Sequence, residues 1–145
     1  MNVYVDTNVI IDLLAKREPF FNDARELFAQ IAADNGLNGY TSVKSVSDVY
    51  YIIHHCLHDK KEAGKMIVKL ISVLYVADNN DIDMLRSFSY KEGDFEGNLI
   101  SALSARLKLD YIVTRNIKDF GGSAVKAVTP VECLDILKLP EISAD

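Results

Sequence analysis

Three polar residues interrupt the first apolar run of the chain. Residues 2–11 read NVYVDTNVII, so Asp6, Thr7 and Asn8 stand between two stretches that belong in a core. Asp6 could simply cap the helix that follows, which is worth roughly 1 kcal/mol. Thr7 and Asn8 add further polar groups at the same place, however, and a cap needs only one. The pattern therefore favours a site at the end of the first strand.

Four further acids and one amide recur near the ends of other expected strands. Asp48 follows the second strand, Asp94 and Glu96 open a later helix, and Asn116 and Asp119 follow the fourth strand. Ligands of open parallel sheets bind beyond the carboxyl ends of the strands, so these side chains should converge. Clustered carboxylates raise one another's pKa values, and a hard divalent cation such as Mg²⁺ or Mn²⁺ relieves that repulsion. Such an ion acidifies water and stabilises phosphoryl charge, so the pattern favours phosphodiester hydrolysis.

Each of these acids also has a structural explanation. Asp48 lies one helical turn after Lys44, and such a pair contributes only ~0.3–0.5 kcal/mol. Asp94 is a natural N-cap, and Glu96 in the first turn of a helix favours the helix dipole. Asp119 fits an ordinary loop. The functional interpretation rests on the convergence of the acids.

Short β-branched runs alternate with amphipathic stretches along the chain, which indicates strands and helices in turn. We expect strands over 2–5, 40–42, 74–78, 110–114 and 126–130, and helices over 7–16, 19–34, 43–57, 60–74, 80–88, 95–108 and 130–137. The expected apolar face of helix 43–57 carries Val43, Val46, Tyr50, Ile53 and Leu57. Alternating strands and helices predict a three-layer α/β/α domain around a central, mostly parallel five-stranded sheet.

Composition limits the class of protein. The 145 residues suit one domain, with 49% apolar and 26% charged residues. No apolar run reaches the ~18 residues that span a bilayer, and we expect no membrane association. Two isolated cysteines and no signal-like segment favour a cytoplasmic location. The net charge of −5 argues against a general nucleic-acid coat but not against a nuclease.

Three segments together resemble the PIN-domain nucleases. They are VDTNVIIDLL (5–14), YTSVKSVSDVYYII (40–53) and DFEGNLISALSARLKLDYIVTRNIKDF (94–120), and the closing VTPVECL (128–134) agrees with them. The resemblance covers nearly the whole chain and implies a single PIN-like domain over residues 1–145. It also implies a metal-dependent ribonuclease that uses Mg²⁺ or Mn²⁺ and acts on RNA. Relatives of this kind are often VapC-type toxins that dimerise and bind an antitoxin protein.

Carried over by position, the resemblance gives each candidate residue a role. The catalytic set is Asp6, Asp48, Asp94, Glu96, Asn116 and Asp119. The metal-binding subset is Asp6, Asp48, Glu96 and Asn116. The residues expected to orient the site are Thr7, Asn8 and Thr114. Apart from the resemblance, the cations at the proposed site are candidates for RNA contact, namely Arg115, Lys118 and Lys44.

One position departs from the family pattern. The usual block reads Asp-Phe-Glu-Asp, whereas this chain reads Asp94-Phe95-Glu96-Gly97, so glycine stands where the third metal-binding acid is expected. Glu96 points roughly 100° away on the same helix. Either Asp94 or Glu96 replaces the missing ligand, or catalysis is impaired. The glycine also costs up to ~1 kcal/mol relative to alanine, with no structural gain expected from the sequence.

Rival interpretations remain open. A phosphatase of the haloacid dehalogenase type also begins with an aspartate after its first strand, but it needs a second acid two residues on, where this chain has Asn8. With Gly97, a non-catalytic module that binds RNA or protein is the stronger rival. His54 and His58 lack the further ligands of a zinc site. Lysines at 60, 61, 65 and 69 form either a solvated helix face or an RNA track.

Overall fold

The computed structural model describes residues 1–139, which form an alternating series of strands and helices. The strands are β1 (Asn2–Val5), β2 (Asn38–Ser42), β3 (Tyr75–Ala77), β4 (Tyr111–Val113) and β5 (Lys126–Val128). The helices are α1 (Thr7–Leu14), α2 (Phe21–Ala32), α3 (Val43–Leu57), α4 (Lys60–Ile71), α5 (Asp81–Ser87), α6 (Phe95–Arg106) and α7 (Pro130–Leu137). A short 3-10 helix, η1 (Ile117–Phe120), is the one element that the sequence did not predict.

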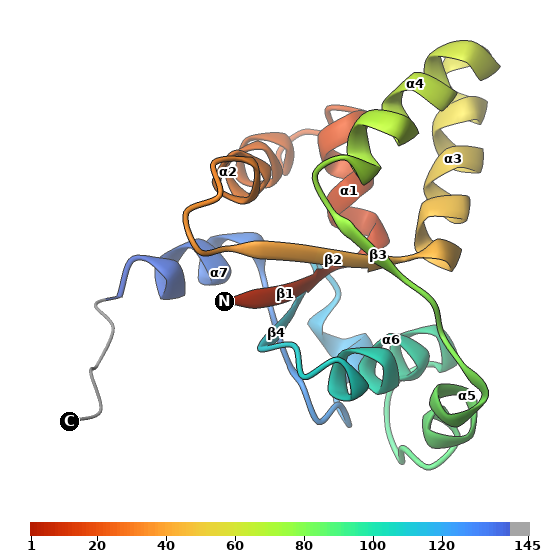
Figure 1. Cartoon of the computed structure of the whole chain (residues 1–145), viewed down its shortest axis with the longest axis vertical. Helices are drawn as coiled ribbons and strands as arrows, with labels where there is room; N and C mark the ends of the chain where they lie inside the picture. The colour runs from red at the N-terminus through yellow and green to blue at the C-terminus, as the bar shows by residue number, and fades with distance from the viewer. Residues whose placement is uncertain (140–145) are drawn as a thin grey trace.

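All strand pairs are parallel, and the sheet order is β3-β2-β1-β4-β5. In Figure 1, α1 to α4 lie above the sheet, whereas α5 and α6 lie below it. Helix α7 packs against α2 on the upper side. The three-layer α/β/α fold with a five-stranded sheet is therefore confirmed, and every strand pair is parallel.

The chain reverses its direction of travel across the sheet beside β1. It moves from β1 to β2 and β3 on one side, and then crosses under the sheet to β4 on the other side of β1. Such a reversal leaves a crevice at the carboxyl ends of the two strands it separates. Here those strands are β1 and β4, joined at their ends by a hydrogen bond of 2.9 Å from the Asp6 amide to the Val113 carbonyl.

The core lies on both faces of the sheet. Val3, Val5 and Val113 point toward α1 and the other upper helices, whereas Tyr4 and Ile112 point toward α6. Parallel strands buried on both faces need such continuous apolar runs. The core therefore fixes the two central strands, and with them the polar residues at their ends.

The predicted apolar face of α3 is wrong by part of a turn. The buried residues of α3 are Ser45, Val49 and Ile53, whereas Val43 and Leu57 at its ends are exposed. Ser45 is buried because its hydroxyl is hydrogen bonded to Tyr4, which apolar periodicity cannot reveal. The rotation turns the Lys44 and Asp48 side of α3 toward the carboxyl edge of the sheet. None of the helices within residues 1–139 is long and apolar enough to cross a membrane.

Candidate active site

A cleft of about 530 Å³ opens at the carboxyl edge of the sheet, where β1 and β4 end. Its walls come from the starts of α1, α3 and α6 and from η1. All six residues of the expected catalytic set line it, namely Asp6, Asp48, Asp94, Glu96, Asn116 and Asp119. Thr7, Asn8 and Lys44 line it as well. The structure thus brings together side chains separated by up to 113 positions along the chain.

Asp6 is held in one orientation at the floor of the cleft. It is the N-cap of α1, and one carboxylate oxygen accepts a hydrogen bond of 2.8 Å from the Thr7 amide. The other oxygen accepts a hydrogen bond of 2.8 Å from the Thr114 hydroxyl. Thr114 lies behind the cleft and is fully buried, and its oxygen also accepts from the Asn116 amide at 3.0 Å. The Asn8 amide group donates long hydrogen bonds to this second Asp6 oxygen, at 3.5 Å, and to the Thr114 hydroxyl, at 3.3 Å.

Asp6 is paired with no lysine or arginine of the described residues. Burial raises the pKa of the Asp6 carboxyl, and the charges of Asp119 and Asp94 raise it further, against the lowering by its hydrogen bonds. Within residues 1–139, no lysine or arginine forms an ion pair with any of these three acids. The inner part of the cleft therefore carries uncompensated negative charge.

The outer acids are different, because Lys44 bridges them. Its ammonium group lies 2.8 Å from a carboxylate oxygen of Asp48 and 3.0 Å from one of Glu96. The hydrogen bond to Asp48, and then that to Glu96, raises the pKa of Lys44. The helical pair of Lys44 with Asp48 is thus present, and it extends across the mouth of the cleft from α3 to α6.

Two of the expected RNA contacts lie outside the cleft. Arg115 turns away from it and forms a two-pronged ion pair with Asp12, at 2.5 and 3.1 Å. Its guanidinium also lies 3.8 Å from the centre of the Phe20 ring. Lys118 is exposed on η1 and faces a neighbouring hollow formed by residues 115–119.

Sequence reasoning missed some residues of the cleft. Arg17, in the turn after α1, lines it and brings a second positive charge beside Lys44. Ser42 and Ser45 line it above the buried Tyr4, whose hydroxyl lies 2.9 and 2.8 Å from their oxygens. Only the N-cap position of Ser42 carried a sequence signal. Nothing in the sequence marks Arg17, because its turn shows no periodicity.

The expectation that Gly97 brings no structural gain is wrong. A Cβ atom on residue 97 would lie 2.5 Å from the main-chain carbonyl oxygen of Asp119. It would also lie 2.7 Å from the carboxylate of Asp94, which caps α6 by accepting from the Gly97 amide at 2.8 Å. Glycine at position 97 therefore allows η1 to pack directly onto the first turn of α6.

The donor chemistry of the inner cleft fits a hard cation. Asp6, Asn116 and Asp119 offer oxygen atoms, which Mg²⁺ and Mn²⁺ prefer. Among the described residues, no three histidine, cysteine, aspartate or glutamate side chains form a complete metal cage. Mg²⁺ is usually held by one or two carboxylates and keeps several waters, so a partial donor set suits it. His54 and His58 likewise belong to no such cage.

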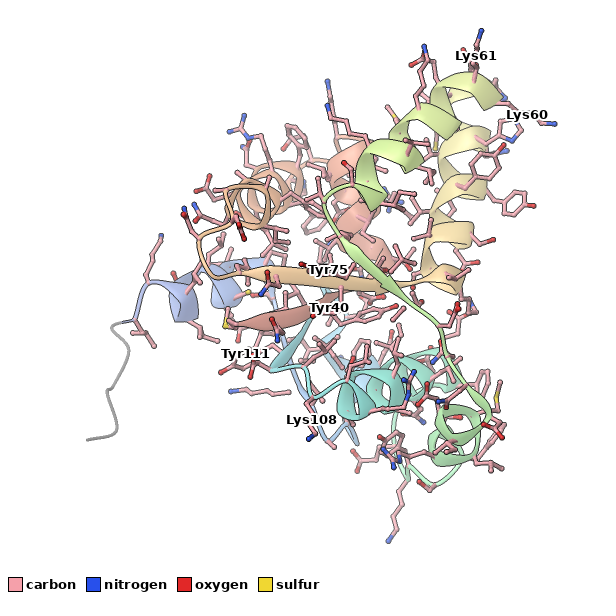
Figure 2. The ribbon with its side chains drawn as sticks, viewed as in Figure 1. Tyr40, Lys60, Lys61, Tyr75, Lys108 and Tyr111 are labelled. Carbon is pink, nitrogen blue, oxygen red and sulfur yellow. The ribbon has the colours of Figure 1, made fainter. Side chains whose placement is uncertain are left out.

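The lysine row lies far from this site. Figure 2 shows Lys60 and Lys61 at the outer end of the α3–α4 pair, pointing away from the sheet. Lys65 is paired with Glu62 at 3.3 Å, and both side chains are largely exposed. The arrangement is that of a solvated helix face.

Comparisons with known proteins agree with this geometry. The sequence profile of the PIN domain matches residues 2–118. No sequence among the curated proteins matches the chain. Solved structures with the same fold include a DNA-bound VapBC from Salmonella typhimurium (TM-score 0.66, 17% identity, covering 90% of this chain and 98% of that one). A toxin–antitoxin complex from Klebsiella pneumoniae is similar as well (TM-score 0.63, 23% identity, 88% and 97% covered). So is VapC20 of Mycobacterium tuberculosis, a toxin that cleaves the sarcin-ricin loop (TM-score 0.60, 13% identity, 76% and 86% covered).

Proposed function

Because the chain belongs to the PIN-domain family, we propose that it is a divalent-metal-dependent endoribonuclease that hydrolyses RNA phosphodiester bonds in the cleft at the ends of β1 and β4. The observation that carries this proposal is the half-buried Asp6 carboxylate, which shares the cleft with Asp94 and Asp119, none of the three forming an ion pair within residues 1–139. Clustered carboxylates of this kind are stable when a cation binds between them. Fixed hydrogen bonds from Thr7 and Thr114 keep Asp6 ready for that role.

In this proposal, Asp6, Asn116 and Asp119 hold Mg²⁺ or Mn²⁺, with Asp94 close by. The bound ion lowers the pKa of a water and stabilises negative charge on the phosphoryl group. Lys44 and Arg17 bind the phosphates that flank the scissile bond, since they are the cations of the cleft lining. Tyr51 also lines the cleft and is 66% exposed, so its ring can stack on an unpaired base.

The test is RNA cleavage by the unaltered protein, Asp6→Asn and Glu62→Gln in Mg²⁺ and Mn²⁺. Asparagine retains an oxygen for the N-cap but removes the charge, whereas Glu62 is an exposed acid on α4, outside the cleft. We expect metal-dependent cleavage by the unaltered protein and by Glu62→Gln, and a loss of at least about a hundredfold in Asp6→Asn. Equal cleavage by all three proteins, or cleavage without metal, would refute the proposal.

Gly97 favours a second candidate function, because it removes a side-chain oxygen from the metal site. The alternative is a PIN-like module that binds RNA or protein without cutting it. RNA binding that is unchanged by chelation of metal, together with no cleavage of any RNA tried, would establish this alternative in place of the nuclease.

We also propose that two copies of the chain associate through α5. The usual burial pattern is reversed in this helix, because its buried residues are the polar Asp83 and Ser87. Its exposed face is apolar and carries Ile82, Leu85 and, at the C-cap, Phe88. Leu85 and Phe88 are 72% and 71% exposed, values that suit a face covered by another surface. A two-fold axis lets one such face cover its own copy. Leu85→Glu should give a monomer by light scattering, whereas Val68→Glu, at an exposed apolar position on α4, should leave the dimer intact.

An antitoxin protein is the further partner that we propose. Five carboxylates and two cations line the cleft, so a basic segment of a partner protein fits its charge. The presence of toxin–antitoxin complexes among structures of the same fold supports this choice. Inhibition of RNA cleavage by the product of a neighbouring gene, relieved by high salt, would be the expected result.

A further inference from the structure

Gly97 lies at the contact between α6 and η1, and it is one of two glycines that surround a single carbonyl group. A Cβ atom on Gly97 would lie 2.5 Å from the Asp119 carbonyl oxygen, and one on Gly93 would lie 2.6 Å from the same atom. Real Cβ atoms do not approach main-chain oxygens so closely, and a backbone oxygen cannot turn aside as a flexible side chain can. Any larger residue at either position must therefore push η1 away from α6.

The other side of this contact is also built from glycine. Gly121 and Gly122 follow η1. A Cβ atom on Gly121 would lie 3.0 Å from the Glu92 carboxylate, and one on Gly122 would lie 3.4 Å from the Glu92 main chain. Gly93 has a φ angle of +85°, which few side chains tolerate. Small residues on both sides thus bring the segment before α6 and the segment around η1 into backbone contact. This contact fixes where Asp119 stands.

The position of Asp119 matters because the other acids on α6 are already engaged. Glu96 is paired with Lys44 at 3.0 Å, and Asp94 caps the helix through the Gly97 amide. Asp119, in contrast, is half-buried in the cleft lining and close enough to Asp6 for the two charges to interact. Its main-chain carbonyl oxygen is the atom nearest to the place that a side chain at residue 97 would occupy.

We propose that Gly97 is a positioning residue: by having no side chain, it seats η1 against α6 so that the Asp119 carboxylate takes the place of the acid missing from α6. The inference rests on the proposed metal site, but it makes a claim of its own about this chain. The close approach of η1 then compensates for the loss of an acidic side chain at residue 97. Restoring an aspartate at position 97 should therefore damage the site instead of repairing it.

The test compares Gly97→Ala and Gly97→Asp with Gly64→Ala. Gly64 is a matched control, because it also lies in a helix and a Cβ atom there would meet nothing within 4 Å. Amide hydrogen exchange of residues 115–122 is measured on metal-free protein, and Mn²⁺ binding is measured by calorimetry without RNA. We expect both Gly97 variants to speed exchange of this segment by about tenfold or more. Their Mn²⁺ affinity should fall by about 10- to 100-fold, as in Asp119→Asn, which measures the role of the carboxylate itself.

Gly64→Ala should leave exchange in this segment and Mn²⁺ affinity unchanged, and it should raise the Tm. Unchanged exchange in Gly97→Ala would overturn the inference, as would tighter Mn²⁺ binding by Gly97→Asp. If the unaltered chain binds no Mn²⁺, the proposed metal-dependent function fails, and the claim that Asp119 replaces a metal ligand fails with it. The exchange result then still decides whether Gly97 seats η1.

Discussion

Breaking the ion pair between Asp12 and Arg115 from one side should be among the most destabilising single substitutions in this domain. The Asp12 side chain is 2% exposed and that of Arg115 is 25% exposed. Breaking a buried pair from one side costs about 3–5 kcal/mol, because a charge is left without a partner. Arg115 can regain part of its hydration, so we expect about 3 kcal/mol for Asp12→Leu. The free energy of unfolding of a domain of this kind is only about 5–15 kcal/mol, so the substitution would remove a large part of it.

Urea unfolding at neutral pH measures this effect, with Glu62→Leu as the control for an exposed pair. The control should change the free energy of unfolding by less than about 1 kcal/mol. The double variant Asp12→Leu with Arg115→Leu should recover most of the loss, because no unpaired charge then remains. A single-variant cost below about 1 kcal/mol, or a double variant as unstable as the sum of both singles, would refute the reasoning.

The same variants decide what Arg115 does. If Arg115 served RNA, Asp12→Leu would free its guanidinium and strengthen RNA binding, whereas Arg115→Leu would weaken it. If Arg115 instead anchors the segment after β4, neither variant should change RNA affinity through charge. Both should instead disturb the turn that carries Asn116 into the cleft. Affinity measured at two salt concentrations separates these outcomes, because phosphate contacts depend on salt.

Three further predictions concern single side chains. Burial raises the pKa of Asp6 above its usual value of 3.8, so the folded state binds a proton more tightly than the unfolded state does. Protonated Asp6 therefore stabilises the fold fully below about pH 3.8, and this stabilisation is lost as the pH rises through the raised pKa. Asp6→Asn should therefore raise the Tm of the metal-free protein at about pH 8 more than at about pH 4, and an equal shift at both would contradict this. Burial also raises the pKa of Cys133 to about 11, so in native protein a thiol reagent should label only the exposed Cys56, and both only after unfolding. Gly39→Ala should destabilise the protein by about 1–3 kcal/mol in urea unfolding, since its Cβ would lie 2.5 Å from Leu74; no change would mean that the strand can shift.

Much of the fold was predictable because its signals are local. The apolar runs gave five strands, and the structure confirms the helix starts predicted after the Asp94 cap and at residue 130. The rotation of α3 was not predictable, because Ser45 is buried through a hydrogen bond to Tyr4, a partner 41 residues away. η1 was missed because a single turn carries no periodicity.

The site was predictable in its membership but not in its electrostatics. Topology alone brings the ends of β1 and β4 together, and this placed Asp6 beside Thr114. Which cation pairs with which acid depends on side-chain directions across the fold. Arg115 follows Thr114 directly, and yet its side chain points to Asp12 on α1. The reason for glycine at position 97 could not be read from the sequence either, because it is the close approach of the Asp119 main chain, which comes from a distant segment.

These directions explain why Asp6, Asp94 and Asp119 form no ion pair within residues 1–139. Lys44 pairs with both outer acids at the mouth of the cleft. Arg115 directly follows Thr114, which is hydrogen bonded to Asp6, so its charge starts from a position beside the inner acids. Asp12 prevents the guanidinium from reaching Asp6 by holding it outside the cleft, against the ring of Phe20. A guanidinium turned toward Asp6 would satisfy the carboxylate and exclude a divalent ion by charge repulsion. The pair with Asp12 therefore fixes the direction of Arg115 and leaves the inner cleft to a cation from solution.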